Sequence, residues 1–167
     1  MMSDSPRVIL LLAFGVISAL PISPRLASAQ SAGGDSTWAV LDVTAAVNSA
    51  IEQSKEGGAE LREKAVRRFS ECSLVYGGLS TLASSAEAKK SYVQAQIATM
   101  EVESTIAKPL QSQRRVELEE AARKSVALTL RTVQAQGDKE VAPLLKSCKA
   151  LNDVRQIKNA LRELPPL

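Results

Sequence analysis

A cysteine and a tyrosine are spaced four residues apart at Cys72 and Tyr76, and two consecutive glycines, Gly77 and Gly78, follow directly. On a helix these two side chains share one face, so they could belong to a reactive site, a pocket or a contact between helices. A reactive thiol needs a cation or a helix N-terminus nearby to lower its pKa. Cys72 lies instead in the middle of a predicted helix, on its apolar stripe, which favours a structural role.

A disulfide is the simplest role for this cysteine. The chain has two cysteines, Cys72 and Cys148, and its N-terminal sequence predicts export into a compartment where disulfides persist. We therefore predict one bond between them, which would join a predicted helix over residues 59–83 to the last predicted helix, over about residues 143–164. For a loop of this length, the chain-entropy estimate is a stabilisation of about 4 to 5 kcal/mol.

An apolar groove is a second possibility for the same region. Helical bundles can hold an apolar ligand between their helices, and the lining here would come from Trp38, Tyr76, Tyr92 and Met100. In the alternative, both tyrosine rings fill the core or its edge, with their hydroxyl groups directed to water or to a backbone carbonyl group. The apolar setting of these residues favours the packing role.

Three carboxylates, Glu117, Glu119 and Glu120, follow Arg114 and Arg115. In helical bundles, metal ions are bound by glutamates that project inward together with histidines. These glutamates fall on the outer side of a predicted helix, and the chain contains no histidine. We interpret the run as a solvated helix face and predict no metal site.

The absence of histidine also narrows the possible functions. It excludes nucleophiles activated by histidine, and histidine-ligated zinc, copper or haem. The sequence lacks a Cys-x-x-Cys pair and the glycine-rich patterns that bind nucleotide phosphates. A formal net charge of +3 is too balanced to indicate a nucleic-acid partner. We predict that the protein is not an enzyme and uses no cofactor.

The N-terminal residues have the pattern of a secretory signal. An apolar run over residues 8–20 is too short to span a bilayer, and small residues occupy the positions that a signal peptidase reads. We predict a signal peptide over residues 1–29, with cleavage between Ala29 and Gln30. The alternative is an uncleaved N-terminal anchor.

The rest of the chain predicts one helical domain over residues 37–167, after a flexible lead over residues 30–36. Apolar side chains recur at spacings of three and four, and aromatic residues make up only 3% of the chain, so Leu, Val, Ile and Ala must form most of the core. The predicted fold class is all-α: an antiparallel bundle of four principal helices with the N-terminal helix packed alongside. The predicted helices cover residues 37–55, 59–83, 84–107, 110–136 and about 143–164.

Local patterns predict the start and the buried faces of individual helices. Ser84 and Glu87 have capping-box spacing at the start of the third helix. In the last helix, Val154 continues an apolar stripe that runs unbroken to Leu161. The stripe of the third helix contains Val93, Ile97, Met100 and Ala107.

Two further predictions concern the charged residues and the glycines of the second predicted helix, over residues 59–83. Glu63 and Arg67 have the spacing of an ion pair on a solvated helix face. Gly77 and Gly78 each cost about 1 kcal/mol within a helix relative to alanine. We expect such a cost to have a reason, either the close approach of a neighbouring helix or a kink.

These patterns together favour an exported helical protein, periplasmic or secreted, that acts by binding or structural association. The alternative is a ligand-carrying or chaperone-like bundle that binds an apolar molecule or a polypeptide. The expected partner is a protein or a small apolar ligand. We expect no nucleic-acid partner and no stable membrane span after signal cleavage.

Overall fold

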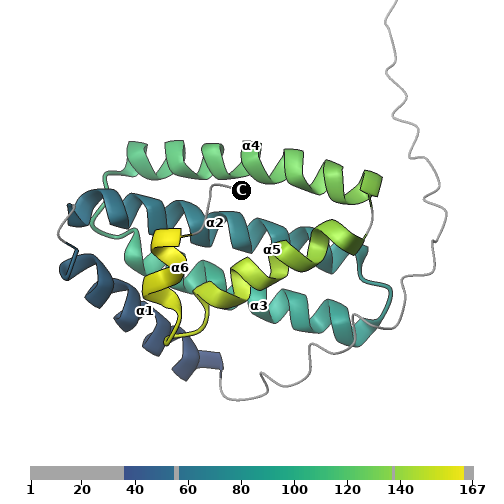
Figure 1. Cartoon of the computed structure of the whole chain (residues 1–167), viewed down its shortest axis with the longest axis horizontal. Coiled ribbons are helices and arrows are strands. Elements are labelled where there is room, and N and C mark those ends of the chain that lie inside the picture. Colours follow the sequence, from purple (N-terminus) through teal and green to yellow (C-terminus); the bar gives the residue numbers. More distant parts are fainter. Residues whose placement is uncertain (1–35, 55–56, 137, 164–167) are drawn as a thin grey trace, which may run out of the picture.

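The computed structural model describes residues 36–54, 57–136 and 138–163, and within these ranges the chain forms helices and no strands (Figure 1). The all-α prediction is therefore confirmed for this part of the chain. The predicted signal peptide and its cleavage site between Ala29 and Gln30 lie outside the described residues. The helices are α1 (Ser36–Glu52), α2 (Gly58–Leu82), α3 (Ala86–Ile106), α4 (Ser112–Gln136), α5 (Asp138–Leu151) and α6 (Ile157–Glu163).

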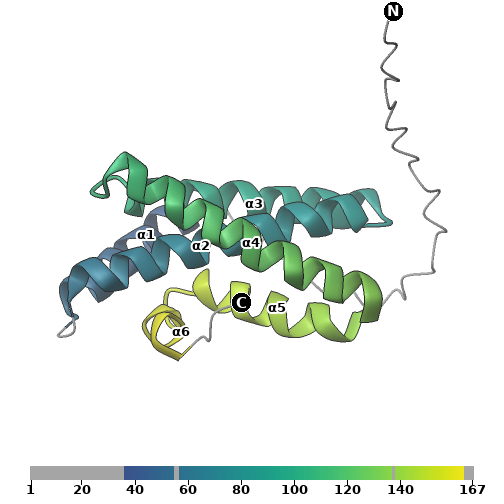
Figure 2. The same cartoon turned by 90° about the horizontal axis from the view of Figure 1, so that it is seen from above.

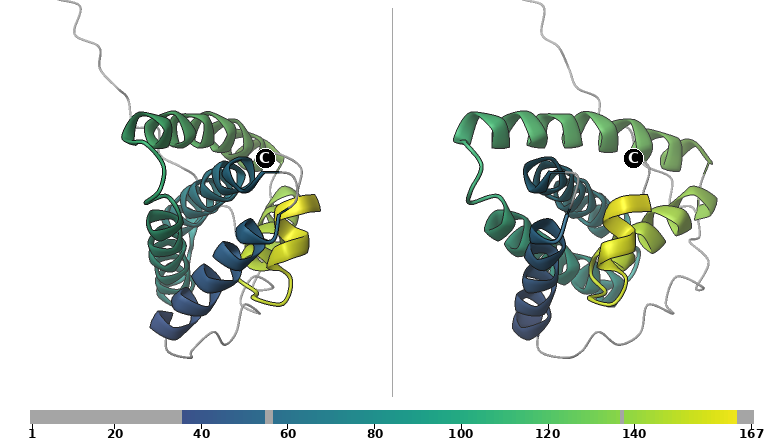
Figure 3. Two further views of the ribbon diagram at one scale, coloured as in Figure 1. Left: turned by 90° about the vertical axis from the view of Figure 1, so that its left-hand side faces the viewer. Right: turned by 60° about the vertical axis from the view of Figure 1, so that its left-hand side comes forward.

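Helix α2 is the centre of the fold and contacts all the other described helices. Figures 2 and 3 show α3 on one side of α2, with α5 and α6 on the opposite side. The larger core cluster lies around α2 and includes Phe69, Val47, Ile106, Leu151 and Leu161, all of them almost completely buried. A smaller cluster joins the C-terminal half of α2 to α4 and α5 and contains Val75, Leu79, Val126 and Leu144.

The prediction of one continuous last helix is wrong, because the chain forms two helices there, α5 and α6. Asp153 organises the turn between them: its Oδ1 accepts from the backbone amide of Arg155 at 2.9 Å, and its Oδ2 accepts from Gln156 Nε2 at 2.9 Å. Val154, which the predicted stripe buries, is 44% exposed in this turn. Helix α5 begins upstream of Pro143, at Asp138.

The predicted buried face of α3 is wrong at two of its four residues, since Ala107 is buried and Val93 is half-buried. Ile97 and Met100 are 52% and 51% exposed, whereas Thr99, Val102 and Ile106 are buried. A buried threonine needs a partner for its hydroxyl group, and Thr99 Oγ1 donates to the carbonyl oxygen of Ala95 at 2.6 Å. This local hydrogen bond lets the helix place a threonine in the core and two apolar residues on the surface.

The start of α3 is one residue later than the capping-box pattern predicts. Ser85 is the N-cap, and its Oγ accepts from the backbone amide of Ala88 at 3.1 Å. The residue three positions after the cap is therefore Ala88 and not Glu87, so the reciprocal part of the predicted box has the wrong spacing. Glu87 still lies in the first turn, where a negative charge favours the helix.

Gly77 and Gly78 lie where α2 is approached closely by two neighbouring helices. A Cβ atom on Gly77 would lie 2.7 Å from Nε2 of Gln96 on α3, and one on Gly78 would lie 2.8 Å from Cδ1 of Leu130 on α4. Helix α2 continues past both glycines to Leu82. The pair thus permits close packing of α3 and α4 against α2, and of the two expected reasons the structure has the close approach.

We expect Gly77→Leu to lower the free energy of unfolding by about 1 to 3 kcal/mol, because four extra carbon atoms must fit between α2 and α3. Gly77→Ala is the matched control. Its single methyl group displaces only the mobile end of Gln96, and the higher helix propensity of alanine offsets part of the cost. Urea unfolding measures both values, and a leucine variant as stable as the wild-type protein would contradict the close approach.

Candidate functional site

The predicted disulfide is present and joins α2 to α5. The Sγ atoms of Cys72 and Cys148 are 2.00 Å apart, and the Cα atoms are 5.5 Å apart. Both residues are buried. Because the chain has two cysteines, this bond leaves no thiol available as a nucleophile.

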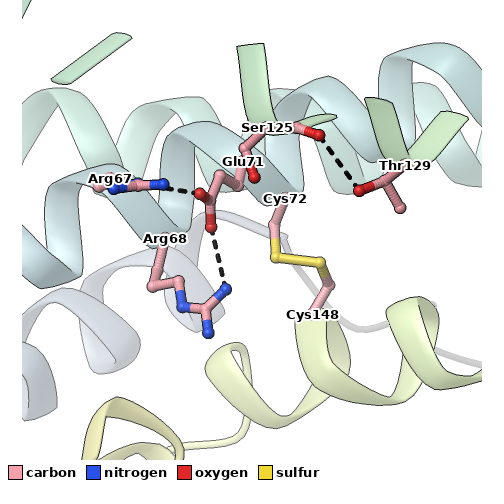
Figure 4. A network of polar contacts seen from close by, with 7 residues as sticks. All are labelled: Arg67, Arg68, Glu71, Cys72, Ser125, Thr129 and Cys148. Carbon is pink, nitrogen blue, oxygen red and sulfur yellow. Dashed lines mark hydrogen bonds and ion pairs between the residues drawn. A yellow bond between two sulfur atoms is a disulfide. The ribbon is translucent and has the colours of Figure 1, made fainter. Parts of the chain in front are cut away.

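A buried carboxylate lies beside this bond, at Glu71. Arg67 Nε donates to its Oε1 at 3.0 Å, and Arg68 Nη1 donates to its Oε2 at 2.9 Å. Figure 4 shows the carboxylate held between the two guanidinium groups, with the Cys72–Cys148 bond next to it. Both oxygen atoms of Glu71 are therefore occupied by charge-assisted hydrogen bonds, which are the strong kind.

The two arginines of this cluster differ in their access to water. The side chain of Arg67 is 37% exposed, whereas Arg68 and Glu71 are buried. Nη2 of Arg68 is buried and has no hydrogen-bond partner among the described residues. Buried charges are tolerated only when they are paired, so the charge of Arg68 depends on Glu71. We call Arg67, Arg68 and Glu71 the buried charge cluster.

Tyr76 lies one helical turn beyond Cys72 and is also buried. Burial raises the pKa of its hydroxyl group to about 12; a hydrogen bond with Asn152 opposes this shift, and the nearby Tyr92 adds to it. The phenol therefore keeps its proton throughout the physiological range and cannot serve as a base there. The carboxylate of Glu71, the phenol of Tyr76 and the two cysteines are thus each held in contacts that stabilise the fold.

The residues of the predicted groove do not share one surface. Tyr76 is in the core, Tyr92 is half-buried and packs against both core clusters, and Met100 is exposed. The side chain of Trp38 lies outside the described residues. A shallow depression of about 90 Å³ occurs elsewhere, and it is lined by Ala50, Gln53, Leu61, Lys158, Leu161 and Arg162.

The carboxylate run of α4 takes part in surface ion pairs. Arg114 donates to Glu117 at 2.7 Å and to Glu63 of α2 at 2.6 Å, and Arg123 pairs with Glu119 at 3.5 Å. The hydrogen bond from Arg114 holds the pKa of Glu63 below its usual value. The predicted partner of Glu63 is therefore wrong, because Arg67 turns inward to Glu71.

Glu103 of α3 is the half-buried carboxylate that faces this run, and its buried Oε1 has no hydrogen-bond partner within the part of the chain that the structure describes. Burial raises its pKa above 4.5; the negative charge of Glu119 raises it further, and the positive charge of Arg115 lowers it. A folded state that holds this proton more tightly than the unfolded chain is favoured at low pH. The contribution is lost as the pH rises from about 4.5 through the pKa of the folded state.

We expect Glu103→Gln to raise the melting temperature at pH 7 slightly, by about 2 °C, because it removes a half-buried charge without a full set of partners. The gain should disappear as the pH falls below about 4.5, where the wild-type carboxyl group is itself neutral. Calorimetry across this pH range measures the effect. Glu120→Gln, at an exposed position of α4, is the control; a Glu103 variant that is less stable than wild type at pH 7 would contradict the sign.

Sequence reasoning missed the buried charge cluster. Its signal was the spacing of Glu71, four residues after Arg67 and three after Arg68; the small residues Ser70, Ser73, Gly77, Gly78 and Ser80 lie close to this cluster in the sequence. Ser73 Oγ donates to the carbonyl oxygen of Ser70 at 2.9 Å, and Ser80 Oγ donates to that of Gly77 at 2.7 Å. Hydroxyl groups satisfied within the helix can be buried, so neighbouring helices cover α2 nearly all round.

The remaining findings concern the described part of the chain as a whole and its comparison with known proteins. In the described part of the chain, no three side chains of the types His, Cys, Asp or Glu are grouped so that they could hold a metal ion. None of the helices in residues 36–54, 57–136 and 138–163 combines the length and the apolar character needed to cross a membrane. Comparison with known proteins finds no matching family model, no matching curated protein and no matching solved structure.

Proposed function

We propose that this is an exported helical protein, periplasmic or secreted, that acts by associating with another polypeptide and without catalysis. The observation that carries the proposal is the presence of large apolar side chains on the surface of two contacting helices. Leu41 of α1 is 58% exposed, and Ile97 and Met100 of α3 are exposed by about half. Ile97 and Met100 are three residues apart and therefore adjoin on the surface of α3, and adjoining exposed apolar side chains are typical of sites that bind another protein.

The architecture that we propose is an antiparallel bundle of four principal helices with α1 packed alongside. The packing of α3 and α4 against α2 supports it. The signal peptide over residues 1–29 belongs to the same proposal, and the Cys72–Cys148 bond supports export because disulfides persist mainly outside the cytosol.

A ligand-carrying or chaperone-like bundle is the second candidate. Pockets for small molecules usually enclose about 300 to 1,000 Å³. The depression between α1, α2 and α6 is about 90 Å³ and is partly lined by charged side chains. This depression is smaller than such a pocket, so it supports an enclosed ligand less well than the exposed apolar residues support association with a protein.

Cross-linking in the native host, followed by mass spectrometry, tests the proposed association. The wild-type protein should capture a defined partner, and Ile97→Asp should lose it. Leu128→Asp is the matched control, because Leu128 is also an exposed apolar residue but lies on α4. The proposal fails if no partner is captured, or if both variants lose the partner equally. A melting temperature that rises with a panel of small apolar molecules would instead favour the carrier.

A further inference from the structure

The outer face of α3 is apolar in its middle and charged at its two ends. We define this outer face by Lys90, Val93, Ile97, Met100 and Glu101, which fall within about 100° of arc at about 100° per residue. Four of these five side chains are exposed and Val93 is half-buried. Helix α3 itself lies on the side of α2 opposite to α5 and α6 (Figures 2 and 3).

The charges at the two ends of this outer face have opposite signs. The start of α3 carries Glu87, Lys89 and Lys90, which sum to one positive charge, and its end carries Glu101 and Glu103, which are both acidic. No charged residue occurs between Lys90 and Glu101. A face with this order is complementary to a copy of itself that is turned end over end, because each basic end then meets an acidic end.

We infer that the outer face of α3 binds a second copy of the chain, with the two α3 helices antiparallel and related by a twofold axis. Lys90 of each copy then lies opposite Glu101 of the other, and the axis passes near the midpoint between them. Ile97 of one copy packs beside Ile97 and Val93 of the other, which covers the exposed apolar surface. This inference deepens the proposed association and rests on it, since it names the partner as the protein itself.

Antiparallel pairing is favoured over parallel pairing by the same charges. A parallel pair would place Lys90 against Lys90 and Glu101 against Glu101, and like charges in direct contact weaken an interface. Two antiparallel helices also have opposed dipoles, which attract each other. Because one helix face buries little area, we expect a weak dimer that is visible at high protein concentration.

Sedimentation equilibrium of the purified, oxidised protein tests the pairing. Lys90→Glu and Glu101→Lys should each weaken dimerisation about tenfold, because every twofold pair contains the altered contact twice. An equimolar mixture of these two variants should recover the wild-type affinity, since one chain then carries two acidic ends and the other two basic ends. Ile97→Asp should abolish the dimer, and unchanged circular dichroism would show that this variant remains folded.

The outcomes separate this inference from the proposed function. A wild-type protein that stays monomeric up to millimolar concentration overturns self-pairing, and if cross-linking still captures another polypeptide the proposed association stands. A dimer that Ile97→Asp does not affect, or whose two charge variants fail to rescue each other, places the contact on another face and also overturns the inference. Raising the salt concentration should weaken the wild-type dimer.

Discussion

Replacing Glu71 by glutamine should lower the free energy of unfolding by about 3 kcal/mol or more, which corresponds to a fall of about 10 °C in the melting temperature. Glutamine is close in shape to glutamate but has no charge, so the substitution leaves the buried guanidinium group of Arg68 without its counter-charge. Arg67 can turn towards water because it is partly exposed, whereas Arg68 cannot. Calorimetry and urea unfolding at neutral pH measure the loss.

The same substitution at a surface ion pair is the matched control. Glu63 also lies on α2 and binds an arginine, but its partner Arg114 is exposed, so Glu63→Gln should change stability far less. A second comparison uses Arg68→Met combined with Glu71→Leu, which removes both buried charges. This double variant should be clearly more stable than Glu71→Gln alone, because an apolar pair needs no counter-charge. Equal, small losses for Glu71→Gln and Glu63→Gln would contradict the role of the buried charge cluster.

The helices themselves could be predicted because their apolar residues follow the helical period. Val43, Val47 and Ile51 of α1 and Phe69, Cys72 and Tyr76 of α2 are buried as the spacing indicates. Glycine and proline marked most of the breaks between helices. The disulfide could be predicted for a simpler reason, since the chain offers one pairing only.

The errors arise where polar groups find partners that the sequence pattern does not reveal. Thr99 enters the core because its hydroxyl group is satisfied by its own helix, and α3 is consequently rotated so that Ile97 and Met100 face outward. The turn between α5 and α6 had a signal in Asn152 and Asp153, which favour turns. The apolar spacing of Val154 concealed that signal. The buried charge cluster depends on neighbours from other helices, and periodicity along one helix does not report those.

Removing the disulfide by Cys72→Ala and Cys148→Ala should lower the free energy of unfolding, mainly because the unfolded chain gains conformational freedom. The cysteines are 76 residues apart, and releasing a loop of this length favours the unfolded state by about 4 to 5 kcal/mol on the chain-entropy estimate. This is a large part of the net stability of a typical domain. Urea unfolding should show a much lower midpoint for the double variant, and reduction of the wild-type protein should have a similar effect.

The consequence for the folded state should be concentrated in α5 and α6. The bond is the covalent tie between α2 and α5, and α6 follows α5 through the turn at Asp153, so reduction should loosen this segment before it loosens α3 and α4. Hydrogen exchange should therefore speed up first at Leu151, Ile157 and Leu161, which the oxidised structure buries. A reductant should leave the double alanine variant unchanged, which controls for other effects of the reagent. If the reduced wild-type protein unfolds at the same urea concentration as the oxidised one, the prediction is wrong. Packing contacts would then be sufficient to hold α5 and α6 in place, and the disulfide would add no measurable stability.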